Sequence, residues 1–326
     1  MNHITHATLG AAAALLAISL ADTASAQQYP ARTVRVVTPY APGGSTDILA
    51  RLLSARLTDT WKQQVVVDNR PGGNTIIGSE HVARSPADGY TLMLQTSGHV
   101  INPSLLKTPY DAIRDFTGVG TVAVGEFLLV THPSVAANSV QEFIALARSK
   151  PGQINYASSG AGSSTHMASE YFNIVGNVQL SHVHYKGGGP ALNDLLGGQV
   201  QVTISVPLAF VSHVRGGKLK ALAVTGANRM SALPQVPTFA EAGLPAYDAS
   251  NWYGIFAPTG LPRPIVERWS SELARILSLQ DVRDSLISQG MDPLIRTPEQ
   301  FTEMMKTDLA KYARIIKTAG IKLENN

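Results

Sequence analysis

Residues 39–47 read PYAPGGSTD and lie between two segments of opposite periodicity. The apolar run before them, residues 33–38 (TVRVVT), is typical of a buried strand. The segment after them, residues 48–57, places apolar side chains at helical spacing. The sequence therefore predicts a strand, a glycine-rich turn and an amphipathic helix in succession.

The residue types in this turn favour an anion. Two glycines allow the backbone to approach a ligand, and a hydroxyl side chain can cap the helix. The free N–H groups of the first helical turn and the helix dipole then attract negative charge. A plain capped turn is the alternative. The candidate residues are Gly43, Gly44, Ser45, Thr46 and Asp47, of which the last would compete with a bound anion if it pointed inward.

The same alternation of strand and helix patterns continues along the chain and predicts βαβ units and a parallel sheet. No repeat and no low-complexity linker interrupts it. Two lobes joined by more than one chain crossing are expected. Further strands are predicted near 65–68, 90–95, 127–131, 154–156, 179–185, 200–205, 219–225 and 252–257, with helices near 75–84, 140–149, 167–175, before 196, 264–277 and 297–318.

Residues 156–166 (YASSGAGSSTH) form a second strand-to-helix segment that is rich in Gly, Ser and Thr. The segment lacks the lysine of a P-loop, and its two spaced glycines are a weak dinucleotide signal. Two neutral, hydroxyl-rich loops in two α/β halves would bracket an anion with backbone N–H and hydroxyl donors. Cofactors are not expected.

Candidate catalytic and metal-binding residues are few. Ser163 or Ser164 with His166 could form a hydrolase site, but a histidine that opens a helix more commonly caps it or supports a neighbour. His182 and His184 face the same side of a predicted strand without a third ligand at zinc spacing. The chain has no cysteine. We expect no enzyme and no metal site, with a periplasmic Ser/His hydrolase as the alternative.

Composition indicates the number of domains, and the N-terminus indicates the cellular compartment. The chain has 326 residues, 44% hydrophobic and 15% charged, which predicts about two globular domains. A formal net charge of +3 without a basic run argues against nucleic acid. The apolar run 9–20 and the Ala-Ser-Ala pattern at 24–26 predict a signal peptide over 1–26, with a buried N-terminal helix as the alternative. We expect a periplasmic monomer.

Further motifs, taken together, resemble the Bug receptors, the extracytoplasmic solute-binding subunits of tripartite tricarboxylate transporters. The resemblance covers nearly the whole mature chain. The matching stretches are PYAPGGSTD (39–47), VVVDNRPGGNTIIGSEHVARSPADGYTLML (65–94), NPSL (102–105), NYASSGAGSSTH (155–166), YKGGGPALNDLLGGQV (185–200), GKLKALAVTGANR (217–229), LPQVPTFAEAG (233–243) and WYGIFAPTGLP (252–262).

The resemblance implies a type II periplasmic binding protein fold, with two α/β lobes and a ligand cleft between them. Lobe 1 is expected to comprise 27–126 plus 251–326, and lobe 2 to comprise 127–250. The implied function is capture of a small carboxylate by lobe closure and its delivery to the membrane subunits of a tripartite transporter. A di- or tricarboxylate, an acidic amino acid or an aromatic carboxylate would serve; a sensor feeding a signalling kinase is the alternative.

The family's gripping residues are carried over by position. We expect ligand contacts from Tyr40, Gly43, Gly44, Ser45, Thr46, Ser158, Ser159, Gly162, Ser163, Ser164 and His166, and also from Thr96 and Ser97 at a strand end. The chain departs from the family pattern at His184 and at 205–207, and the second departure affects the far end of the ligand. The KGGGP segment at 186–190 and Gly197-Gly198 flank a predicted helix as its entry turn and its C-terminal stop, and plain turn chemistry is the accepted interpretation for Gly197 and Gly198. Trp252 and Tyr253 are interpreted as core or cleft wall.

Overall fold

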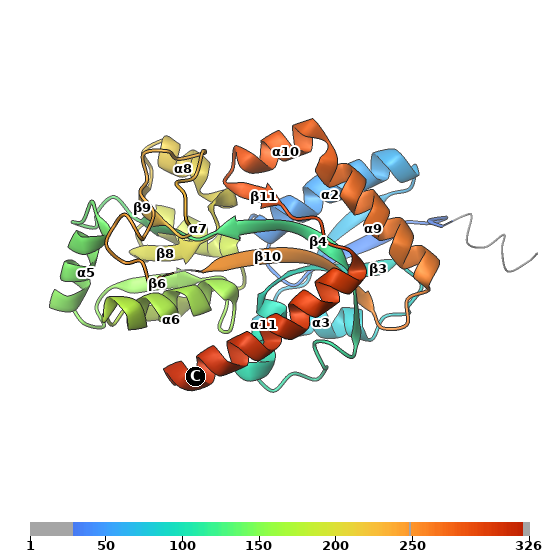
Figure 1. The fold of residues 1–326 in the computed structure, drawn as a ribbon, viewed down its shortest axis with the longest axis horizontal. Helices are drawn as coiled ribbons and strands as arrows, with labels where there is room; N and C mark the ends of the chain where they lie inside the picture. The colour runs from blue at the N-terminus through green and yellow to red at the C-terminus, as the bar shows by residue number, and fades with distance from the viewer. Residues whose placement is uncertain (1–28, 248, 322–326) are drawn as a thin grey trace, which may run out of the picture.

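The computed structural model describes residues 29–247 and 249–321, in which two sheets form the centres of two α/β lobes (Figure 1). The first sheet has the strand order β11-β4-β10-β3-β1-β2 and the second has the order β7-β6-β8-β5-β9. The predicted signal peptide, residues 1–26, lies outside the described residues.

The elements have the following bounds. The strands are β1 (Val34–Thr38), β2 (Val65–Asn69), β3 (Thr91–Thr96), β4 (Phe116–Glu126), β5 (Leu128–Thr131), β6 (Asn155–Ser158), β7 (Ser181–His184), β8 (Val202–Ser205), β9 (Lys220–Val224), β10 (Ser250–Pro258) and β11 (Met291–Pro293). The α-helices are α2 (Ser45–Trp61), α3 (Ile76–Ala83), α4 (Gly98–Ile101), α5 (Val140–Ser149), α6 (Ser164–Gly176), α7 (Gly188–Leu196), α8 (Val211–Arg215), α9 (Arg263–Ser278), α10 (Gln280–Ile287) and α11 (Pro298–Ala319).

Both sheets are mixed, so the prediction of a parallel sheet is wrong in part. β1 pairs in parallel with β2 and β3, and β6 pairs in parallel with β7 and β8. In contrast, β10 is antiparallel to β3 and β4, and β5 is antiparallel to β8 and β9. The reason is the path of the chain: β4 leads toward the second sheet and β10 returns from it, so the two lie side by side in opposite directions (Figure 1).

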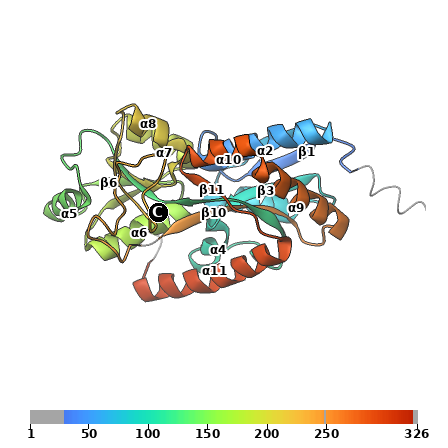
Figure 2. The same ribbon diagram turned by 45° about the horizontal axis from the view of Figure 1, so that its top comes forward.

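Helices cover both faces of the first sheet because its strands are apolar on both sides. Val36 packs in one cluster with Leu53 of α2 and Trp269 of α9. Its neighbour Val37 packs in another cluster with Phe301 of α11. Successive residues of a strand point to opposite faces. Figure 2 accordingly shows α2 and α9 on one side of this sheet and α11 on the other.

The two sheets are joined by closely spaced crossings. Only Phe127 separates β4 of the first sheet from β5 of the second. The Phe127 amide donates to Thr225 Oγ1 at 2.7 Å, and the Thr225 amide donates to the Phe127 carbonyl at 2.8 Å. Thr225 directly follows β9, where the chain begins its return toward β10. The outgoing and returning segments are therefore tied together between the sheets.

Candidate ligand-binding site

The turns after β1 and β6 meet at one cavity between the two sheets. We define loop 1 as residues 39–44 and loop 2 as residues 159–163, each of which leads into a helix. The cavity is small: the volume that the centre of a water molecule can occupy is about 30 Å³. Its lining comprises Tyr40, Gly44, Ser45, Thr46, Thr96, Ser159, Ser164, Thr165, Gly188, Ser205, Val206, Asn251 and Tyr253. No lining residue carries a charged side chain.

Three helix N-termini converge on this lining. α2, α6 and α7 have 17, 13 and 9 residues, and their N-caps are Gly44, Ser163 and Gly187. The first-turn residues Ser45 and Ser164 both line the cavity. Their amides belong to the groups of a helix that have no intrahelical acceptor. Because the positive ends of the three helix dipoles also lie here, the cavity suits an anion without a cationic side chain.

Loop 1 contacts the N-terminal end of α7 through backbone atoms, without side chains between them. We call this contact, between residues 41–44 and residues 186–189, the glycine seam. The Ala41 amide donates to the Lys186 carbonyl at 2.7 Å. A Cβ atom on Gly189 would lie 2.0 Å from the Pro42 carbonyl oxygen, and one on Gly44 would lie 3.1 Å from the Gly188 nitrogen. The segment 186–190 is thus more than the turn that the sequence predicts, because only glycine permits this approach.

Asp47 fixes the shape of loop 1 and does not line the cavity. Its carboxylate accepts from the Gly43 amide at 3.1 Å, from Arg51 Nε at 2.9 Å and from Asn69 Nδ2 at 3.0 Å. Burial alone would raise the pKa of Asp47, but these hydrogen bonds outweigh burial and hold the pKa below its ordinary value. The negative charge is therefore compensated within lobe 1.

The lobe 1 wall is a network of neutral polar groups. Tyr40 Oη and Thr96 Oγ1 are 3.1 Å apart, and Ser97 Oγ donates to Asn251 Oδ1 at 2.7 Å. Burial raises the pKa of Tyr253. Hydrogen bonds with Ser45 and Asn251 offset this rise only in part, so the phenol stays protonated. Ser97 therefore orients Asn251 from behind, and the side chain that lines the cavity is the amide.

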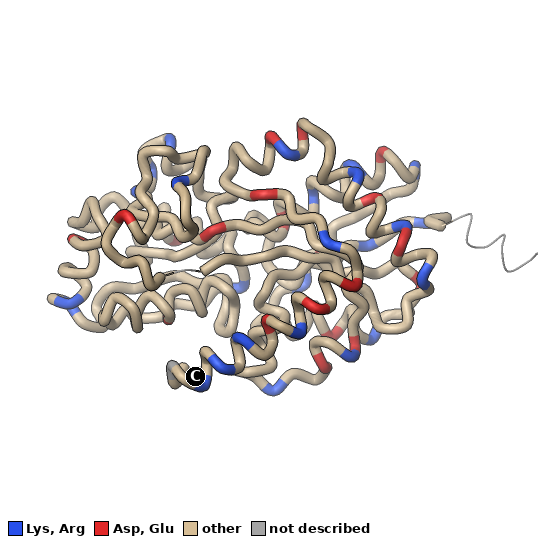
Figure 3. The backbone as a smooth tube through the Cα atoms, in the orientation of Figure 1, with Lys and Arg blue, Asp and Glu red and all other residues tan. Residues whose placement is uncertain are grey.

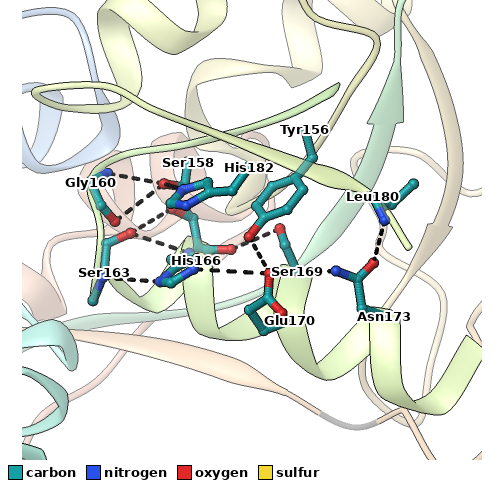
Figure 4. Close-up of polar contacts among 12 residues, drawn as sticks. Tyr156, Ser158, Gly160, Ser163, His166, Ser169, Glu170, Asn173, Leu180 and His182 are labelled. Carbon is teal, nitrogen blue, oxygen red and sulfur yellow. Dashed lines mark hydrogen bonds and ion pairs between the residues drawn. The ribbon is translucent and has the colours of Figure 1, made fainter. Parts of the chain in front are cut away.

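Loop 2 is held from within lobe 2 (Figure 4). Ser163 Oγ accepts from the His166 amide at 3.2 Å and so caps α6. The Gly162 amide donates to His166 Nδ1 at 3.0 Å, and the Ser159 amide donates to Thr165 Oγ1 at 2.8 Å. Most amides of the loop are thus satisfied inside it, which leaves the first turn of α6 for a ligand.

His166 is turned away from the cavity. Its side chain is buried, its Nδ1 faces Gly162, and its Nε2 lies 4.0 Å from Glu170 Oε1. Burial, with a smaller contribution from His184, lowers the pKa of His166 to about 4. Both ring nitrogens are directed at groups other than a serine hydroxyl. The structure therefore lacks the hydrogen bond from Ser163 or Ser164 to the imidazole that a serine hydrolase would need.

The predicted residues divide into two groups. Those that line the cavity are Tyr40, Gly44, Ser45, Thr46, Thr96, Ser159 and Ser164. Those that do not line it are Gly43, Asp47, Ser97, Ser158, Gly162, Ser163 and His166. The lining residues that the prediction omitted are Thr165, Gly188, Ser205, Val206, Asn251 and Tyr253. The sequence offered a signal for three of these: the departure from the family pattern at 205–207 covers Ser205 and Val206, and the aromatic pair Trp252-Tyr253 covers Tyr253.

The described residues lack two features that would suggest other functions. They contain no group of three His, Cys, Asp or Glu side chains arranged to hold a metal ion. Within residues 29–247 and 249–321, no helix has the length and apolar character needed to cross a membrane. Figure 3 shows acidic and basic residues interspersed along α9, α10 and α11.

Comparison with known proteins gives consistent matches. The family model described as the tripartite tricarboxylate transporter family receptor matches residues 49–321. Protein BugT of Bordetella pertussis (strain Tohama I) is 36% identical over 308 residues, which cover 94% of this chain and 94% of that protein.

Solved structures match over similar lengths. Rpa4515 of R. palustris with adipate has 36% identity and a TM-score of 0.87, covering 90% of this chain and 99% of that chain. MatC (Rpa3494) from Rhodopseudomonas palustris with bound malate has 32% identity and a TM-score of 0.84, covering 88% of this chain and 100% of that chain. The periplasmic binding protein BugD has 31% identity and a TM-score of 0.87, covering 91% of this chain and 100% of that chain, so both the sequence and the fold are similar to those of periplasmic binding proteins.

Proposed function

The chain belongs to the tripartite tricarboxylate transporter receptor family, and on that premise we propose that it binds a small carboxylate between its lobes and delivers it to a membrane transporter. The proposed ligand contacts come from both lobes. They are the cavity-lining residues of loops 1 and 2, the first turns of α2, α6 and α7, and the amide of Asn251.

The observation that carries the proposal is the convergence of three helix N-termini on a cavity with no charged side chain. Two planar carboxylate oxygens can each accept from several amides and hydroxyls. A hydrogen bond to a charged group contributes about 1.5–3 kcal/mol, so several such bonds replace an arginine. The adipate and malate bound by the two R. palustris relatives support a dicarboxylate.

The cavity volume supports binding by closure. One water molecule needs roughly 10–15 Å³ on this measure, so a cavity of about 30 Å³ is smaller than a dicarboxylate requires. The ligand would enter while the lobes are apart. Closure, which forms the glycine seam, would then leave a larger cavity around the ligand than the one in this structure. Lobe 1 would comprise 27–126 plus 251–326 and lobe 2 would comprise 127–250, with the pivot beside Phe127.

The remaining parts of the proposal follow from the family. Residues 1–26 act as the export signal, the mature monomer works in the periplasm, and the membrane subunits of the transporter are its protein partners. The chain captures its ligand without chemical change, consistent with the position of His166 behind the cavity. Transport, as opposed to signalling through a kinase, is tested by uptake of labelled ligand in cells that lack this receptor.

The first experiment is a thermal-shift screen of the mature protein, refolded to remove carried ligand, against succinate, malate, adipate, citrate, glutamate and nicotinate. A true ligand at 100 times its Kd should stabilise the folded state by about 2.7 kcal/mol. The compound should be recovered unchanged. No shift with any carboxylate, or recovery of a cleaved product, would overturn the proposal.

Substitution of Gly44 locates the site. A Cβ atom there would lie 3.1–3.2 Å from the Gly188 and Gly189 backbone, so Gly44→Leu should block closure and abolish binding while lobe 1 stays folded. Gly197→Leu is the matched control, because Gly197 is exposed, has a negative φ, and a Cβ there would come no nearer than 3.4 Å to another atom. Wild-type affinity in Gly44→Leu would place the ligand elsewhere.

A further inference from the structure

Two stacked imidazoles, His166 and His182, lie beside loop 2 and are not among the cavity-lining residues (Figure 4). We propose that His166 and His182 are positioning residues, which hold loop 2 in its ligand-binding shape only while both rings are neutral. This inference rests on the proposed function, since it concerns the loop that would grip the carboxylate.

The first attachment point is Gly162. Its amide donates to His166 Nδ1 at 3.0 Å, which requires that Nδ1 carry no proton. In the neutral ring the proton is then on Nε2, which faces Glu170. Gly162 has a φ of 76° and directly precedes Ser163, the N-cap of α6. His166 therefore fixes the backbone immediately before the helix end that the carboxylate would meet.

The second attachment point is Ser158, at the end of β6. His182 Nε2 and Ser158 Oγ are 2.6 Å apart. Ser158 Oγ also lies 3.2 Å from both the amide nitrogen and the carbonyl oxygen of Gly160. His182 thus acts through the serine hydroxyl on the middle of loop 2, while His166 acts on its far end.

The rings support each other by stacking. The centroids of His166 and His182 are 4.1 Å apart at an angle of 9°, and the Tyr156 ring is also nearly parallel to His182, at 4.8 Å and 13°. Movement of either imidazole would disturb the other and both attachment points. The two histidines come from α6 and β7, so the stack also links three elements of lobe 2 behind the loop.

Protonation of this stack conflicts with the loop geometry. A proton on His166 Nδ1 would point at the Gly162 N–H, and two donors would face each other in place of a donor and an acceptor. Two charged imidazoles at this separation would also repel. The titratable groups that face the pair are Tyr156 on β6, His184 on β7 and Glu170 on α6.

The sign of the pH effect follows from burial. Burial is the largest contribution that lowers the pKa of His166 to about 4 and of His182 to about 3; neighbouring histidines add to it. Groups with depressed pKa values stay neutral at pH 7 and gain protons only as the pH falls through those values. Loop 2 should therefore keep its shape down to about pH 5 and lose it near pH 4.

The first test needs no ligand. In ¹⁵N-labelled mature protein at pH 7, imidazole spectra should show His166 with a proton on Nε2 only, and the Gly162 amide should exchange slowly. A proton on His166 Nδ1 at pH 7 would overturn the inference. This result stands even if no compound in the carboxylate panel binds, an outcome that would instead count against the proposed function.

The second test compares variants with the panel carboxylate that gives the largest thermal shift. His166→Phe keeps a stacking ring but leaves the buried Gly162 amide unpaired, and should weaken binding about tenfold or more. His166→Asn supplies a neutral acceptor and should recover most of that loss. His213→Phe, on α8, is the control for removal of a histidine elsewhere in lobe 2.

The pH profile separates positioning from a general structural role. The ratio of wild-type to His166→Asn affinity cancels protonation of the ligand itself. This ratio should be constant from pH 8 to 5 and fall between pH 5 and 4, because only the wild type has a titrating ring at position 166. A ratio that stays flat to pH 4, or a Phe variant that binds as tightly as the wild type, would contradict the inference.

Discussion

Replacing Gly189 by alanine tests the glycine seam with the smallest possible side chain. The new Cβ atom would lie 2.0 Å from the Pro42 carbonyl oxygen and 3.2 Å from the Gly43 carbonyl carbon. An ordinary contact needs about 3.5 Å, so loop 1 and the entry of α7 would have to separate by about 1.5 Å. The neighbouring atoms are backbone and cannot rotate away.

The expected effect is confined to closure. Gly189 is the second residue of α7 and does not have a positive φ, so alanine suits its local conformation and should favour the helix slightly. Overpacking of this kind costs about 1–3 kcal/mol. If the closed form bears that cost, ligand affinity should fall by about 5- to 150-fold while the stability of the ligand-free protein is unchanged or higher.

Titration calorimetry measures the affinity, and small-angle scattering with and without ligand measures the closure. The matched control is Gly197→Ala at the other end of the same helix, where the nearest atom would lie 3.4 Å from the new Cβ. If Gly189→Ala bound and closed like the control, the seam would not form in the liganded receptor. The steric argument would then be wrong.

Three further substitutions probe other parts of the site. Asn251→Asp keeps the acceptor for Ser97 but puts a charge beside the carboxylate, so calorimetry should show an affinity loss of about 100-fold or more; binding within tenfold of wild type would remove Asn251 from the site. Asp47→Asn should lower the free energy of unfolding at pH 7 by about 1.5–3 kcal/mol, and because the pKa of Asp47 is depressed, urea titrations should show this difference shrinking as the pH falls below about 3.9. Gly162→Ala forces a side chain to a φ of 76° and to within 2.5 Å of Asn102 Oδ1, so both stability and affinity should fall. Because Asn102→Ala itself removes hydrogen bonds to Asn74 and Thr75, the effect of Gly162→Ala is also measured in that background, where it should shrink only by the part due to the contact; no remaining effect would exclude backbone strain.

Elements with clear periodicity could be predicted from the sequence, whereas the longest strand of the first sheet, β4, could not. β4 has eleven residues, yet Gly118, Gly120 and Gly125 interrupt its pattern and give it the appearance of a loop. The structure explains these glycines by close packing, which is tightest at Gly125, where a Cβ would lie 2.4 Å from Met291 Sδ of β11. A Cβ on Gly118 would lie 3.0 Å from Phe301 of α11, and one on Gly120 would lie 3.4 Å from Leu273 of α9. β4 therefore has glycine in place of larger residues where α11 and α9 pack closely against its two faces.

The site shows the same division between local and distant information. The turns of loops 1 and 2 are local motifs with glycine, cap and hydroxyl signals, so both could be predicted. Asn251 lines the same cavity from β10, about 200 residues beyond loop 1, and no local pattern marks it, whereas the aromatic pair Trp252-Tyr253 left open whether Tyr253 faces the core or the cleft. The role of Gly189 depends on a segment of the other lobe. Such positions are set by the folded topology.

The uncharged cavity lining has a consequence for the medium in which the receptor works. Mobile ions weaken attractions between exposed charges over roughly 8–10 Å at ordinary ionic strengths, whereas buried interactions are screened much less. A carboxylate held by the amides of Ser45 and Ser164, within a closed cavity, interacts with fixed dipoles that salt cannot displace. Ionic strength should therefore change the rate at which the ligand arrives more than the time for which it stays bound.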